Sequence, residues 1–137
     1  MAELAEFRRY IEFDIMELVI QHLDKNEEYI QRMRENVEKI PLLKQNNASI
    51  AEFVENDMEF HRLFGKACCN VLIEKVYNFI LEYLEKSIAY THERQDRGAR
   101  SFESHRLIMD AIDQKDSSIA KAAIDHTVEV WEQLQII

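Results

Sequence analysis

Apolar residues recur at steps of three and four along almost the whole chain, which is the spacing of a buried face on an α-helix. In the first run, for example, Phe7, Ile11, Ile15 and Leu18 fall on one side of a helix. No stretch alternates in the manner of a strand. The predicted helices cover residues 2–24, 27–40, 49–70, 71–92, 101–112 and 117–134.

Polar residues and one proline mark the expected ends of these helices. Pro41 cannot donate a backbone hydrogen bond and is expected to end the second helix. Ser49 followed by Glu52 has the spacing of a capping box at the start of the third. Ser101 and Ser104 are candidate caps for the fifth.

The composition supports the same architecture. The chain of 137 residues contains 2 glycines and 1 proline, too few for the many tight turns of a sheet protein. We therefore predict an all-α protein, an antiparallel bundle of about six helices, in which residues 1–137 form a single domain.

The charge limits the partners of this domain. Because 26 acidic residues outnumber 17 basic ones, the net charge is −9, which repels nucleic-acid phosphates and anionic membrane surfaces. No secretory signal or membrane-spanning run is visible. The adjacent Cys68 and Cys69 suit neither an ordinary disulfide nor a CxxC metal site, and we expect both to be reduced and buried. These features predict a cytoplasmic protein without a membrane partner.

A small set of polar residues carries the candidate chemistry. Asp57 and His61 are four residues apart and therefore share one side of a helix, next to apolar Phe60 and Phe64. With His105 and His126 from later helices, they could converge on one divalent ion, and this mixed oxygen and nitrogen set suits Zn, Ni, Mn or Fe. The alternative is a simple helical ion pair with structural histidines. By their polar neighbours, His22 and His92 are expected in solvent.

Four segments in register resemble the FCD domain, the effector-binding domain of FadR-type GntR transcription regulators. Asp57-Met58-Glu59-Phe60-His61 with Ala67 and Asn70 is similar to the D-x-x-F-H…A-x-x-N motif of that family. The other matches are Glu6–Glu12 to E-x-R-x-x-(L/I)-E, Ser101–Ile108 to S-x-x-E-H-R-x-I with Ser104 in place of Glu, and Ala111–Ala123 to A-I-x-x-x-D-x-x-x-A-x-x-A.

This resemblance implies a helical bundle whose central cavity holds a divalent metal such as Zn or Ni, with Asp57, His61, His105 and His126 as ligands. The fourth position is open, because an ungapped match places Thr127, one residue further, where the family has histidine. We select His126, since an imidazole is a better metal ligand than a hydroxyl.

The resemblance also implies a function without catalysis. A small carboxylate effector would bind beside the metal, where Arg8 is a candidate contact, although Arg8 more readily pairs with Glu12 on its own helix. The domain would form a homodimer, and DNA would be bound only through a winged helix-turn-helix that is missing from this chain. Two alternatives remain, a metal-dependent helical-bundle enzyme and a metal-free structural dimerisation bundle.

Overall fold

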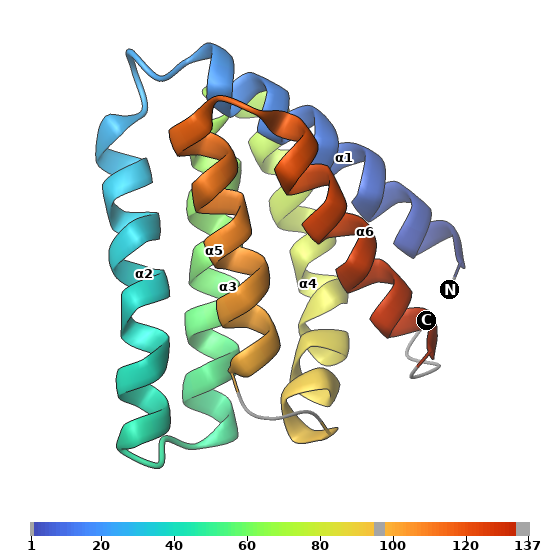
Figure 1. The fold of residues 1–137 in the computed structure, drawn as a ribbon. Helices are drawn as coiled ribbons and strands as arrows, with labels where there is room; N and C mark the ends of the chain where they lie inside the picture. Colours follow the sequence, from blue (N-terminus) through green and yellow to red (C-terminus); the bar gives the residue numbers. More distant parts are fainter. Residues whose placement is uncertain (1, 95–97, 134–137) are drawn as a thin grey trace.

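The protein is a bundle of helices in which neighbours along the chain run in opposite directions (Figure 1). The computed structural model describes residues 2–94 and 98–133. Within them, as predicted, lie six helices and no strand. The helices are α1 (Ala2–Gln21), α2 (Glu27–Gln45), α3 (Ile50–Ala67), α4 (Val71–Arg94), α5 (Ala99–Gln114) and α6 (Ser117–Gln133).

The third helix occupies the centre of the packing. It contacts α2, α4 and α1, while α6 packs against α5 and α1 (Figure 1). Aromatic side chains of α3 and α4 fill the interior, with Phe60, Phe64 and Tyr77 fully buried. Gly65 lets the two helices approach closely, because a Cβ atom there would lie 3.0 Å from the ring of Tyr77. The fold thereby holds the polar side of α3 inside the bundle.

The start of α3 agrees with the sequence prediction, whereas the end of α2 and the start of α5 do not. The capping box is confirmed: the Glu52 N–H donates to Ser49 Oγ at 3.2 Å, and the Ser49 N–H donates to Glu52 Oε2 at 2.7 Å. The prediction that Pro41 ends its helix is wrong, since α2 continues to Gln45. Pro41 is exposed, so the backbone hydrogen bond it cannot make is lost on the solvent side of the final turns.

The start of α5 also differs from the prediction. The N-cap is Gly98, with φ 76° in the left-handed region that favours glycine, and not Ser101 or Ser104. Ser101 Oγ instead donates to the Gly98 carbonyl at 3.2 Å. A Cβ at Gly98 would also lie 2.8 Å from the ring of Phe53, so this position needs glycine for two reasons.

The two cysteines have different surroundings. Cys68 is buried as expected, whereas Cys69 is exposed, and both are free thiols. The expectation that both are buried is thus wrong for Cys69, which follows the end of α3 and has a positive φ of 58°. Among the described helices, none is long and apolar enough to cross a membrane.

Candidate metal centre

Three side chains from two helices converge inside the bundle. Asp57 and His61 come from α3 and His105 from α5, and all three are buried. One potential ligand atom from each lies within 4.8 Å of the other two. Stacking on Phe60, with ring centroids 3.8 Å apart and planes within 6°, fixes the His105 ring. The sequence prediction that these three residues meet is therefore confirmed.

One oxygen of Asp57 lies between the two imidazoles without a hydrogen bond from either. Asp57 Oδ1 is 3.2 Å from His61 Nε2 and 3.4 Å from His105 Nε2, but no aligned donor reaches it among the described residues. His105 Nδ1 is likewise buried without a hydrogen-bond partner in that part of the chain. An unsatisfied buried polar group costs about 1–3 kcal/mol. A cation held by Asp57 and the imidazoles would give Oδ1 the partner that it lacks.

A chain of buried hydrogen bonds determines which nitrogen of His61 carries a proton. Burial, reinforced by the negative charge of Glu12, raises the pKa of Tyr77 well above its usual value, so the phenol stays protonated. Its O–H donates to Glu12 Oε2 at 3.1 Å. The 2.9 Å contact between the Tyr77 oxygen and His61 Nδ1 must then be donated by the imidazole.

The orientation of His61 follows from that assignment. With Nδ1 donating to Tyr77, the other ring nitrogen, Nε2, faces Asp57 Oδ1 at 3.2 Å. A metal ion between these two atoms would bind Nε2 in place of a proton. A metal-binding histidine usually donates its other N–H to a protein acceptor, which His61 does through Tyr77. The arrangement therefore has the chemistry of a metal ligand.

The electrostatics of the group favour an ionised Asp57 beside a neutral His105. Burial alone would raise the pKa of Asp57, but His105, His61 and His92 together hold it well below its usual range. Burial lowers the pKa of His105, which Asp57 only partly opposes. Carboxylate and uncharged imidazole are the forms that coordinate a divalent cation.

Arg8 extends the same chain to the first helix. Its Nε donates to Glu12 Oε2 at 2.8 Å, as expected from the sequence, and both side chains are buried. Burial would lower the pKa of Arg8, but the adjacent Glu12 raises it, so the guanidinium remains charged. Arg8 thus lies in the same interior region as the candidate ligands, joined to them through Glu12 and Tyr77.

His92 on α4 is a member of the site that the sequence analysis missed. The expectation of a solvent residue is wrong: only 4% of His92 is exposed, and its Nε2 lies 2.9 Å from Asp57 Oδ2. Its ring stacks on Phe53, with centroids 5.9 Å apart. A signal was present, because His92 extends the buried series Leu81, Leu84 and Ile88 at helical spacing. The charged neighbours Glu93 and Arg94 concealed it.

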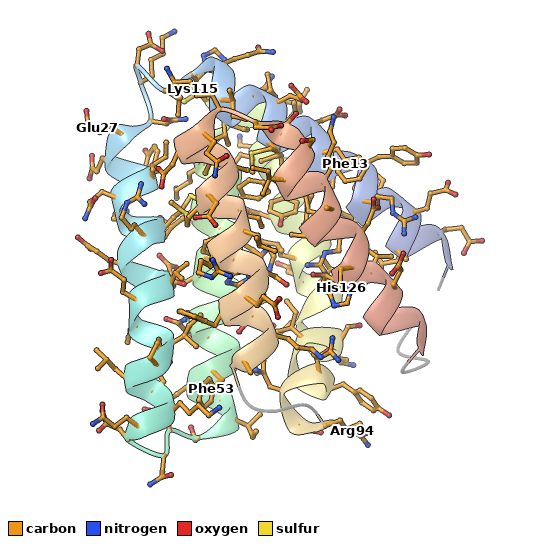
Figure 2. The ribbon with its side chains drawn as sticks, in the orientation of Figure 1. Phe13, Glu27, Phe53, Arg94, Lys115 and His126 are labelled. Carbon is orange, nitrogen blue, oxygen red and sulfur yellow. The ribbon has the colours of Figure 1, made fainter. Side chains whose placement is uncertain are left out.

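His126 lines the same cavity as the other candidate ligands but is not in close contact with them. His126, labelled on α6 in Figure 2, has an exposed side chain, and its Nε2 lies 3.4 Å from a guanidinium nitrogen of Arg100. Thr127 is less exposed; its Oγ1 is 3.3 Å from Ser104 Oγ and also donates to the Ala123 carbonyl. His126 does not belong to the group formed by Asp57, His61 and His105, and Thr127 lines the same cavity.

The candidate ligands and their neighbours line a cavity of about 310 Å³. Its wall comes from α1, α3, α4, α5 and α6, together with Gly98. The candidate ligands and His92 lie on it with Arg8 and Glu12, and α5 and α6 add Ser104, Thr127 and apolar residues. A volume near the lower end of the range for ligand pockets fits a small organic molecule.

Comparison with known proteins identifies the family. The FCD domain model matches residues 3–129, and the chain therefore belongs to the FCD domain family, the effector-binding regulatory domains of GntR regulators. A solved structure titled Streptococcus agalactiae GntR shares the fold, with a TM-score of 0.71 and 23% identity. The alignment covers 96% of this chain and 57% of that one. No curated protein matches the chain.

The hydrogen-bond chain behind His61 gives the first testable prediction. Tyr77→Phe removes the hydroxyl that joins His61 to Glu12, leaving two buried groups with one partner fewer. We expect the free energy of unfolding, measured with urea, to fall by about 1–3 kcal/mol. Tyr83→Phe on the exposed side of α4 is the matched control and should change it by less than about 0.5 kcal/mol. Equal effects of the two substitutions would contradict the assignment.

Proposed function

We propose that this chain is the ligand-sensing and dimerisation domain of a cytoplasmic, FadR-type GntR transcription regulator, in which a small organic acid binds beside a divalent metal. The observation that carries the proposal is the buried group of Asp57, His61 and His105 on the wall of a cavity. Family membership supports the regulatory role. As in the resemblance that suggested it, DNA would be bound by another domain of the regulator.

The donor set suggests which metals the site would take. Two imidazole nitrogens and a carboxylate oxygen suit Zn or Ni better than Ca or Mg, which prefer oxygen ligands alone. Three protein ligands would leave at least one coordination position for water or for an oxygen of the effector. His126 lines the cavity but contacts Arg100 and lies outside the close group, so we assign the metal to the other three.

The charge of the cavity favours an anionic effector. Arg8 and Glu12 neutralise each other as a buried pair, and Asp57 contributes one negative charge. A divalent ion would make the total positive, which favours a carboxylate at the open coordination position. The guanidinium of Arg8, on the same wall, would donate hydrogen bonds to the bound acid.

Metal content tests the site directly. We expect purified protein to hold about one equivalent of a transition metal by elemental analysis, and His61→Ala to lose it. Chelation should lower the melting temperature, because an ion at 100 times its Kd stabilises the folded state by about 2.7 kcal/mol. His22→Ala is the control, and His126→Ala should also retain the metal. Unchanged metal content in His61→Ala would show that the assignment is wrong and would favour the metal-free structural bundle.

Effector binding tests the function. We expect acetate, malonate or succinate, screened individually against the metal-loaded protein by thermal shift and calorimetry, to include at least one binder. Arg8→Lys keeps the charge but loses the planar fork, and should weaken that binding by about tenfold or more. Arg9→Lys, next along α1, is the control. Conversion of the bound acid into a product would contradict the proposal and indicate the metal-dependent enzyme instead.

An exposed apolar stripe on α4 supports the proposed homodimer. Leu72, Val76, Phe79 and Tyr83 recur at steps of three and four, and each is at least 40% exposed. Exposed Lys75 and Glu82 lie along the same side of the stripe. If two copies of α4 pair antiparallel about Phe79, Lys75 of each copy approaches Glu82 of the other. This self-complementary charge pattern favours a second copy of the chain as the occupant.

Oligomeric state checks the dimer. Phe79→Glu places a charge at the centre of the stripe, where dimerisation would bury it without a partner. We expect sedimentation to show monomer for this variant and dimer for the unmodified protein, with metal content unchanged. Tyr10→Glu, an exposed aromatic on α1, is the control and should remain dimeric. A dimer that survives Phe79→Glu would rule out this surface.

A further inference from the structure

The carboxylate of Asp57 is held differently at its two oxygens. Oδ1 faces His61 and His105 without a hydrogen bond, as described above. Oδ2 is 2.9 Å from His92 Nε2, in hydrogen-bond geometry. A carboxylate ion only accepts hydrogen bonds, so His92 must be the donor. Helix α4 therefore fixes the oxygen that the two candidate ligand imidazoles do not face.

We infer that His92 is a positioning residue for the metal centre: it holds Asp57 from behind, so that the carboxylate binds the metal through Oδ1 alone. The inference rests on the proposed function, since it presupposes a metal at Asp57, His61 and His105. The proposed function assigns roles to those three residues, and this inference assigns one to His92, which is not a ligand. A ligand carboxylate fixed by a hydrogen bond cannot rotate away, which raises its affinity for the metal.

Two observations argue that His92 positions Asp57 and is not itself a ligand. The three atoms that lie within 4.8 Å of one another come from Asp57, His61 and His105, and no atom of His92 joins that group. The His92 Nε2 proton is used in the bond to Oδ2, and a metal on that nitrogen would displace it. Stacking on buried Phe53 holds the ring in this orientation.

The role of His92 matters more because this chain has Thr127 where an ungapped match to the family places a histidine. In the last helix Thr127 stands at the position where the motif has histidine, and its hydroxyl is engaged with Ser104 and the Ala123 carbonyl. The metal is then left with three protein ligands, one of them a carboxylate. The orientation of that carboxylate has a correspondingly larger effect on affinity, which makes the bond from His92 measurable.

The test compares two substitutions at position 92 in the full chain, using Co²⁺ and Zn²⁺ as probes. His92→Leu removes the donor, and we expect Zn²⁺ affinity, measured by chelator competition, to fall 10- to 100-fold. His92→Gln retains an N–H donor and should recover most of that loss. The visible absorption bands of bound Co²⁺ should change in His92→Leu and return in His92→Gln. His22→Leu is the control and should change neither quantity.

Counting imidazoles separates the two roles. X-ray absorption at the zinc edge should show two imidazole ligands in the unmodified protein and in both variants at position 92. A count of three that falls to two in His92→Leu would overturn the inference, because His92 would then be a ligand. Unchanged affinity in His92→Leu would also overturn it, and so would a loss that His92→Gln does not recover.

His61→Ala keeps this inference distinguishable from the proposed function. If His61→Ala abolishes metal binding while His92→Leu does not weaken it, only the role of His92 fails. If His61→Ala leaves metal binding intact, the metal centre itself is misassigned and both proposals fail. Urea denaturation of the metal-free variants shows whether a change in affinity is accompanied by a loss of folding.

Discussion

A single buried carboxylate organises the interior of this bundle. Asp57 is surrounded by imidazoles from three helices, His61 from its own helix, His92 from α4 and His105 from α5. A charge in an apolar interior is costly unless its partners offset the loss of water. Here the partners come from three helices: His61 and His105 lie near Oδ1, and His92 lies near Oδ2. The polar group thus specifies how α3, α4 and α5 are placed around it.

The influence of that group extends to the first helix through protonated and charged side chains. His61 donates to Tyr77, Tyr77 donates to Glu12, and Glu12 accepts from Arg8. Each step joins residues in a different helix or one turn apart, so a change at the ligand atoms has a physical route to α1. Under the proposed function, an effector would have to favour one arrangement of helices over another. The side chains of this network would then be groups whose contacts differ between the two arrangements.

Much of the fold and part of the site could be predicted because they depend on local spacing. Helix number and the shared side of Asp57 and His61 follow from periodicity. His105 was a candidate by its residue type, and the motif resemblance then supported it. His92 was missed since its burial depends on how the end of α4 packs on α3, which charged neighbours in sequence do not reveal. The continuation past Pro41 and the cap at Gly98 likewise depend on exposure and tertiary contacts. One residue of helical rotation separates Thr127 from His126, too little for a motif match to decide between them.

Helix α4 carries a different kind of side chain on each of its two sides. Its inner side carries Tyr77 and His92, which contact opposite ends of the Asp57–His61 pair, and its outer side carries the apolar stripe around Phe79. Because a helix is stiff over this length, turning or sliding it to relieve a strained bond inside also shifts the pattern of side chains that it shows outside. If the proposed interior site is filled, a movement of α4 there would also change the surface that α4 presents outside.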